Sequence, residues 1–222
     1  MKTVVLLFAF CLFRLTAVSQ VTSFVIEEER LNKSLKDSLE RIYESDQSVR
    51  MALVEARRSE KPSLYLDSLQ HIIIETDRTN LKLVNLIIER HGWVGPTLVG
   101  IKGAQGLFLV VQHADLETQE NYLPIIMEGE KQGQILSSNV AILLDRVAMR
   151  QGKKQKYGSQ GFTDRESGKG YIYPILDLDN LDIHRQTMGL PPMKEYVKGW
   201  DVEKYRTDLP KIEEILRVQN VK

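Results

Sequence analysis

The sequence is poor in cysteine, since Cys11 is the only one among 222 residues. A single cysteine forms no disulfide within the chain and builds no multi-cysteine zinc site. An excess of either charge is also missing, because lysine plus arginine and aspartate plus glutamate number 30 each. This balance provides no strong basic field for a nucleic acid. We therefore expect no nucleic-acid partner, and a fold that relies on its hydrophobic core.

Apolar runs long enough to cross a bilayer are absent, and the longest one near the N-terminus has another interpretation. Residues 1–19 combine Lys2, an apolar run from Val4 to Phe13 and the small-residue motif Ala17-Val18-Ser19. This is the pattern of an export signal, and we predict cleavage before Gln20. The mature protein would then be periplasmic or secreted, without a membrane span. An uncleaved anchor is the alternative, although a span needs about 20 apolar residues.

One internal stretch is unusually apolar. Residues 91–115 read HGWVGPTLVGIKGAQGLFLVVQHAD, and between Ala104 and Val111 only Gln105 and one glycine interrupt the apolar side chains. A helix that is apolar on all sides has no solvent face, so other elements must surround it. The run ends in Gln112, His113 and Asp115, which brings polar groups close to the interior. We expect any functional site to lie there.

The remaining periodicity predicts a single, mainly α domain over residues 20–222 with a small β-hairpin in its C-terminal half. Apolar residues three or four apart indicate helices over 24–58, with room for a break near Ser45, and over 63–91, 116–132 and 137–152. Gly103 should open the central helix, and Ser137 or Ser138 should cap the helix that follows Gly133. Strands are expected over 155–162 and 171–174. Short helices over 181–188 and 193–200 and a peripheral helix over 202–218 complete the prediction.

The helix predicted over 63–91 carries polar residues on its apolar face. At 100° per residue, Asp77, Asn80 and His91 fall on the same stripe as its aliphatic side chains. A carboxylate facing an apolar core is costly unless it is paired. The stripe therefore faces a polar cavity or lies at the rim of the core. On the preceding helix, Asp46 and Arg50 have the spacing of a solvated helical ion pair.

No recognised catalytic motif is present, and no cofactor is evident. His91, His113 and Asp115 are the residue types of a two-histidine, one-carboxylate metal site, but at no known ligand spacing. The same residues and Asp77 are candidates for acid–base catalysis, which needs a positioned imidazole or carboxylate. Asp115 also has a structural interpretation, as the N-cap of the next helix.

The order of the motifs resembles one family. The stretch from His91 to Asp115 is followed by DRVAMRQGKKQKYGSQ, a hairpin and RQTMGLPPMKEY. This order, over about residues 46–196, is similar to the uncharacterised bacterial family called domain of unknown function 6624. Val94 stands where proline is usual, and Ser159 where threonine is usual. The resemblance implies membership but no activity. It also implies one constellation of polar residues, namely His91, Gln112, His113, Asp115, Asp145, Arg146, Gln155, Tyr157 and Gln160.

Three functions remain open at this point. The first is a binding module with a polar pocket for a small polar or peptide-like ligand. Its binding residues would be Gln112, Asp145, Arg146, Gln155, Tyr157, Gln160 and Asn80. The second is a hydrolase that uses His113 or His91 as base, with Asp77 or Asp115 to orient it, and with or without a metal. The third is a structural or interaction protein whose polar motifs lock the core. Binding leads, because no catalytic spacing is recognised; the oligomeric state is not indicated.

Overall fold

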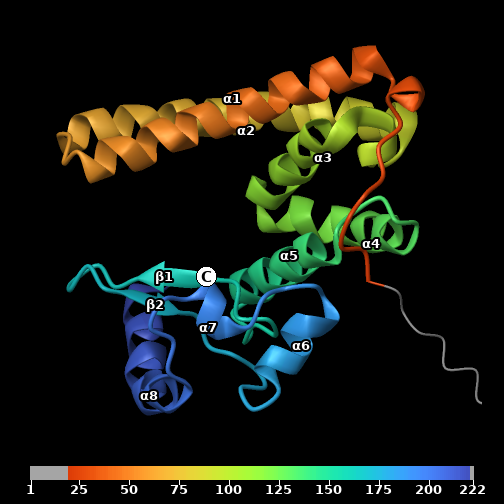
Figure 1. Ribbon diagram of the computed structural model, residues 1–222. Helices are drawn as coiled ribbons and strands as arrows, with labels where there is room; N and C mark the ends of the chain where they lie inside the picture. Colours follow the sequence, from red (N-terminus) through yellow and green to blue (C-terminus); the bar gives the residue numbers. More distant parts are fainter. Residues whose placement is uncertain (1–19, 221–222) are drawn as a thin grey trace, which may run out of the picture.

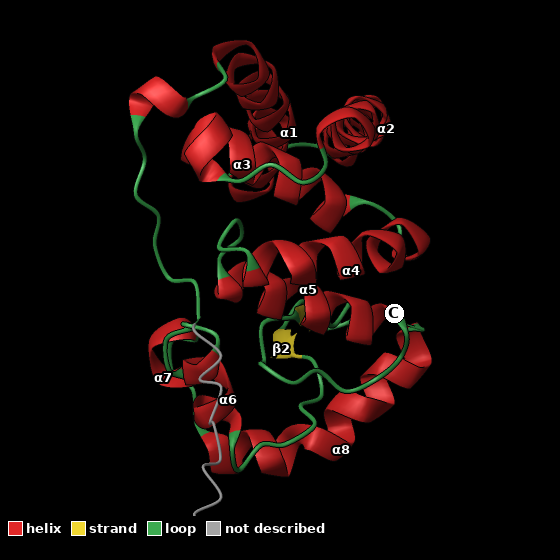
Figure 2. Ribbon diagram, turned by 90° about the vertical axis from the view of Figure 1, so that its right-hand side faces the viewer, coloured by secondary structure: helices red, strands yellow, loops and turns green. Residues whose placement is uncertain are grey.

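The structure is a computed structural model that describes residues 20–220, so the predicted export signal lies outside the described residues. It confirms the mainly α prediction, and its elements form three tiers (Figures 1 and 2). The first tier contains α1 (Lys33–Arg58), α2 (Ser63–His91) and α3 (Pro96–His113), and the second contains α4 (Leu116–Lys131) and α5 (Ser137–Arg150). The third contains β1 (Gly161–Thr163), β2 (Gly170–Ile172), α6 (Leu181–Thr187), α7 (Met193–Tyr196) and α8 (Val202–Gln219). None of the helices between residues 20 and 220 is long and apolar enough to cross a bilayer.

Helices α1 and α2 form a long antiparallel hairpin that extends beyond the other elements (Figure 1). The bounds of α2 are those that its periodicity predicts. Helix α1 begins at Lys33 and not near Phe24, because the side chain of Asn32 caps it by accepting a hydrogen bond from the Leu35 N–H at 3.1 Å. The sequence allows a break near Ser45, but α1 is continuous from Lys33 to Arg58.

Helix α3 begins before the predicted Gly103, at Pro96, and bends at Gly100, whose φ is 71°. Proline is compatible with a first helical turn, and glycine adopts positive φ without strain. Further along, a Cβ on Gly106 would lie 2.5 Å from the Leu39 carbonyl oxygen, so α3 packs directly on the backbone of α1. The side chain of Gln105 remains exposed, so the surrounding of α3 is incomplete. The main core draws buried residues from all five helices α1 to α5, among them Leu39, Val84, Leu107, Ile126 and Leu143.

Of the helix caps predicted for α4 and α5, the structure confirms the first and contradicts the second. Asp115 caps α4, since its Oδ1 accepts from the Thr118 N–H at 2.8 Å. Ser137 does not cap α5 with its side chain, contrary to expectation, nor does Ser138, because the N-cap residue is Leu136. The Ser137 hydroxyl instead accepts from the Val21 N–H at 2.8 Å, and the Ser137 N–H donates to the Val21 carbonyl oxygen at 3.0 Å. Ser137 thus fastens the N-terminal segment to α5.

The third tier has a hydrophobic core of its own. The antiparallel strands β1 and β2 are shorter than predicted, with Phe162 opposite Tyr171. Gln155 does not extend the hairpin and forms an isolated parallel bridge with Ile175. Helix α8 packs on this tier through buried side chains, including Ile212, which is 1% exposed. The last helix therefore completes the second core.

Candidate functional site

The predicted constellation does not lie in one place. Four of its members, Asp145, Gln155, Tyr157 and Gln160, lie together around the loop that follows α5. His113 is the last residue of α3 and contacts α1. Arg146, on α5, lies near the Arg50 that contacts His113. The other members are dispersed, with His91 exposed at the end of α2, Asp115 at the N-cap of α4 and Gln112 buried in α3.

Asp145 organises the loop after α5 from a fully buried position. Its Oδ1 accepts from the N–H groups of Lys156 and Tyr157 at 2.8 and 2.9 Å. Its Oδ2 accepts from both the N–H and the hydroxyl of Ser159, each at 2.9 Å. A carboxylate that accepts this many hydrogen bonds has little capacity left for a ligand. Asp145 thus holds the loop in shape.

Gln155 is equally occupied. Its side-chain N–H groups donate to the carbonyl oxygens of Gln160 and Tyr173 at 2.9 and 2.7 Å, and its Oε1 accepts from the Gln160 N–H at 2.8 Å. Arg185 supports the same loop, because it donates to the carbonyl oxygens of Tyr157 and Pro191, both at 2.6 Å. These side chains satisfy buried backbone groups, which a folded chain requires.

A second polar cluster lies where the end of α3 meets α1 and α2. The Nδ1 atom of His113 is 3.0 Å from Asp46 Oδ1 and 3.1 Å from Arg50 Nε. Arg50 Nη2 is 2.7 Å from Asp77 Oδ1 and 3.3 Å from Asp46 Oδ1. Three helices therefore each contribute to one network of alternating charges.

The tautomer of His113 decides whether this network presents a hydrogen-bond donor or an acceptor to solvent. Its Nδ1 atom can donate to Asp46 or accept from Arg50, but not both. An unprotonated Nδ1 at 3.0 Å from the Asp46 carboxylate would place two lone pairs against each other. We therefore assign the proton to Nδ1, donated to Asp46. The Arg50 N–H, 3.1 Å from Nδ1, then also faces a donor, but Arg50 keeps the carboxylates of Asp46 and Asp77 as partners. In this tautomer Nε2 is an acceptor; it has no partner among residues 20–220 and is not sealed from solvent.

Asp46 is the buried anchor of the cluster, with 1% of its surface exposed. Burial alone would raise the pKa of this carboxyl group. The hydrogen bond and charge of His113, the charge of Arg50 and a hydrogen bond from Gln47 outweigh burial and lower the pKa below the ordinary 3.8. Asp46 is thus ionised at neutral pH and stabilises an imidazole that carries its proton on Nδ1.

Arg146, on α5, lacks a counterion among the described residues. Its Nε is buried without a hydrogen-bond partner, and no ion pair within residues 20–220 involves its guanidinium. Burial, and then the positive charges of Arg150 and Arg50, lower its pKa. An arginine nevertheless stays protonated in proteins. The two Nη atoms also have no described partner and are not sealed from solvent.

Arg150 completes a group of three guanidinium groups around the end of α3. It donates a hydrogen bond to the carbonyl oxygen of Ala114, between His113 and Asp115. Burial lowers the pKa of Arg150, while the charge of Asp115 raises it. The cluster made of Asp46, Arg50, His113, Arg146 and Arg150 is called the arginine–histidine cluster below.

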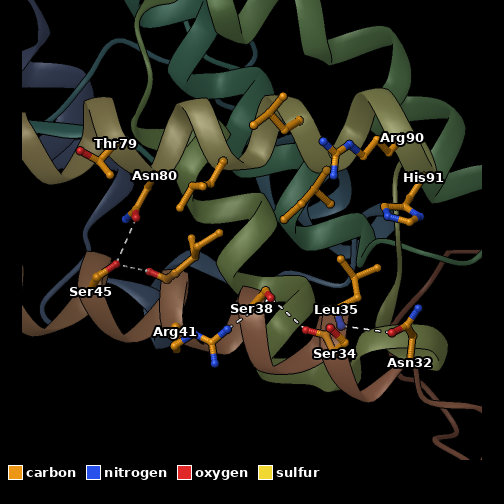
Figure 3. Close-up of a pocket in the computed structure, with 14 residues that line it drawn as sticks. Asn32, Ser34, Leu35, Ser38, Arg41, Ser45, Thr79, Asn80, Arg90 and His91 are labelled. Atoms are coloured by element: carbon orange, nitrogen blue, oxygen red, sulfur yellow. Dashed lines mark hydrogen bonds between the residues drawn. The ribbon is translucent and has the colours of Figure 1, made fainter.

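The polar stripe of α2, which consists of Asp77, Asn80 and His91, lies in two different environments. Asp77 belongs to the arginine–histidine cluster through Arg50. Asn80 is buried and lines a groove between α1 and α2, with the exposed His91 at the far end of the same groove (Figure 3). Gln112 contributes its backbone, since its carbonyl oxygen accepts from the Gln119 side chain at 2.6 Å.

Two residues of the cluster are misread from sequence alone. Asp46 and Arg50 have the spacing of a solvated pair, but Asp46 is buried, so that interpretation is wrong. A signal was present, because Asp46 continues the buried series Leu35, Leu39 and Ile42 at a spacing of three or four. Within residues 20–220 no three histidine, cysteine, aspartate or glutamate side chains are placed to hold a metal ion.

Comparison with curated proteins and with solved structures gives no match. A family model described as "Family of unknown function (DUF6624)" matches residues 33–208. The match runs from the start of α1 into α8 and includes every residue of the arginine–histidine cluster and of the loop around Asp145. The chain therefore belongs to the DUF6624 family.

Proposed function

We propose that the protein binds a small ligand through an anionic group, a carboxylate or a phosphate, at the arginine–histidine cluster. The observation that carries this proposal is the guanidinium of Arg146, which has a buried, unpartnered Nε and two like charges nearby. Burying a cation without a counterion costs free energy. An anion would supply the missing partner, and the guanidinium fork matches the oxygens of a carboxylate or phosphate.

The other members of the cluster give the ligand a second point of contact. His113 Nε2 accepts a hydrogen bond, so a hydroxyl or amide N–H next to the anionic group would suit it. The charge of Arg50 is already paired with Asp46 and Asp77, so Arg50 is less available to the ligand than Arg146. This combination fits a small polar acid or the C-terminal end of a peptide.

Melting experiments at constant ionic strength test the proposal. The probes are inorganic phosphate and acetate, with chloride as the reference anion. The variant is Arg146→Gln, and the control is Arg206→Gln, which removes an exposed arginine paired with Asp179 at 2.7 Å. Phosphate or acetate should raise the melting temperature of wild type and control and leave Arg146→Gln unchanged. Equal shifts in all three proteins, or none in wild type, would refute anion binding at Arg146.

Acid–base catalysis is the second candidate function, favoured by the Asp46–His113 hydrogen bond. A buried carboxylate on Nδ1 leaves Nε2 as the base, as in the hydrolases that use a histidine base. In ester hydrolysis, Nε2 would take a proton from water, the hydroxide would attack the carbonyl carbon, and the leaving alkoxide would receive that proton. The free Arg146 guanidinium would stabilise the oxyanion.

The catalytic candidate is tested with p-nitrophenyl acetate. His113→Gln should abolish release of nitrophenolate, and Asp46→Asn should reduce it strongly, because the imidazole loses its orientation. His71→Gln is the matched control, since His71 is exposed on α2. Release that is unchanged in His113→Gln would show that the histidine is not the base and would leave the anion-binding proposal intact.

Export is part of the same proposal, and it rests on residues 1–19. The charged start, apolar run and Ala17-Val18-Ser19 motif support cleavage before Gln20. Mass spectrometry of the protein isolated from its native cells should give a chain that begins at Gln20. A mass that still includes Met1 would contradict cleavage.

A further inference from the structure

A groove between α1 and α2 is distinct from the arginine–histidine cluster. It has a volume of about 760 Å³, and all 14 residues that line it belong to α1, to its N-cap Asn32 or to α2 (Figure 3). Along α1 it extends from Asn32 to Ser45, about 20 Å at a rise of about 1.5 Å per residue. Its length therefore suits an extended ligand.

The groove has an apolar surface that residues 20–220 do not cover. Leu35 and Ile42 of α1 are buried beneath it, and Ile87 of α2 is partly buried. Leu83 and Leu86 line it with 45% and 46% of their surface exposed. Burying exposed leucines is favourable, because it removes apolar area from water. An apolar ligand chain would gain this stabilisation.

Several polar groups that line the groove already have partners within the chain, whereas one buried group does not. Ser38 donates to the Ser34 carbonyl oxygen at 2.9 Å, and Ser45 lies 2.9 Å from the Ile42 carbonyl oxygen and 3.1 Å from Asn80 Oδ1. The Nδ2 atom of Asn80 is buried and has no hydrogen-bond partner in the described part of the chain. In Figure 3 its side chain points across the groove toward Ser45. A buried donor of this kind calls for an acceptor from a ligand.

The charges that line the groove are all positive. Arg41 comes from α1 and Arg90 from α2, and no aspartate or glutamate is among the lining residues (Figure 3). Glu44, an acid near Arg41, is already paired with Lys102 at 2.6 Å. Within residues 20–220 neither arginine takes part in an ion pair. A ligand head with one negative charge complements this surface, whereas a cationic head would be repelled.

We infer that this groove binds an amphiphile with a long apolar chain and a single carboxylate, as in a fatty acid. The chain lies along Leu83 and Leu86, the carboxylate pairs with Arg41 or Arg90, and Asn80 Nδ2 donates to an oxygen of the ligand. The inference is independent of the proposed function, because none of the groove residues belongs to the arginine–histidine cluster.

Calorimetric titration of the full chain with dodecanoate, below its micelle concentration, tests the inference. Butanoate carries the charge without the chain, and dodecanol carries the chain without the charge. Dodecanoate should bind at least tenfold more tightly than either one. The double variants Arg41→Gln/Arg90→Gln and Leu83→Gln/Leu86→Gln should each weaken dodecanoate binding tenfold or more.

Two controls make the result specific to the groove. Arg78→Gln removes an exposed arginine of α2 that does not line the groove, and Arg146→Gln removes the free cation of the other site. Both should bind dodecanoate as wild type does. Absence of dodecanoate binding, or equal binding of dodecanol, would overturn the inference. Loss of binding in Arg146→Gln with full binding in the groove variants would place the carboxylate in the other site and also overturn it.

Discussion

Replacing Asp145 by asparagine tests whether the loop after α5 is a structural lock. The asparagine side chain has the same shape but presents an NH₂ group where one carboxylate oxygen accepts hydrogen bonds. If the NH₂ group replaces Oδ2, the Ser159 hydroxyl can turn and accept a hydrogen bond from it. The Ser159 N–H cannot adapt: in the wild type it donates to Oδ2 at 2.9 Å, and in the variant it would face another donor. If it replaces Oδ1, the Lys156 N–H loses its acceptor, and the Tyr157 N–H keeps only Oδ2, at 3.2 Å.

The expected cost follows from the better of these two orientations. One buried N–H left without a partner costs about 1–3 kcal/mol. Hydrogen bonds to a charged acceptor contribute about 1.5–3 kcal/mol, and the neutral amide weakens those that remain. These effects are not additive, so we expect Asp145→Asn to lower the free energy of unfolding by about 2–4 kcal/mol.

Urea unfolding together with amide hydrogen exchange measures this effect. The matched control is Asp201→Asn, because Asp201 also accepts a backbone N–H, that of Lys204 at 2.8 Å, but is exposed. It should cost no more than about 1 kcal/mol, as a helix cap does. Exchange of the Lys156, Tyr157 and Ser159 amides should accelerate in Asp145→Asn. Equal unfolding midpoints for the two variants would refute the assignment of Asp145 as a structural hub.

Three further changes test other contacts. Gly106→Ala should lower the free energy of unfolding by about 1–3 kcal/mol through overpacking, because its Cβ would lie 2.5 Å from the Leu39 carbonyl oxygen. Gly103→Ala is the control and should cost less in the same urea experiment, because its Cβ would meet side chains at 3.3–3.4 Å. Asp46 has a lowered pKa, so its contribution to stability is complete above about 3.8 and is lost as the pH falls through the lowered value. The stability difference between wild type and Asp46→Asn should therefore narrow below pH 4, and a constant difference would contradict this. Ser137→Ala should speed exchange of the Val21 amide, its hydrogen-bond donor, without disturbing α5; unchanged exchange would show that the contact is weak in solution.

Sequence patterns predict a helix boundary well where the residues that set it lie at the boundary itself. Helix α2 begins after Pro62 and ends before Gly92, and both residues act through their own backbone angles. Asp115 caps α4 through an N–H only three residues away, so its structural interpretation could be drawn from sequence. The start of α3 was misplaced, because Gly103 serves the packing on α1 and the bend occurs at Gly100.

The candidate site was only partly predictable, for a related reason. His113 was found because it follows an apolar run, and Asp77 because it interrupts an apolar stripe. The sequence predicts Arg50 as a surface residue, since nothing within its own helix shows that His113 and Asp77 will contact it. Asp145 and Arg146 are neighbours in sequence, yet within residues 20–220 the side chain of the first accepts several hydrogen bonds and that of the second takes part in none. Their chain positions alone do not separate these roles.

By itself, the sequence determined the mainly α class, the bounds of its most regular helix and the family membership, because these depend on periodicity and on motifs within short stretches. The tertiary structure alone decided which polar residues are sealed and which are open. Ser137 meets Val21 across 116 positions, and Asp46 meets His113 across 67. The free energy of a polar side chain depends on whether a partner reaches it after folding. That partner is chosen by the packing of helices, which no local pattern encodes.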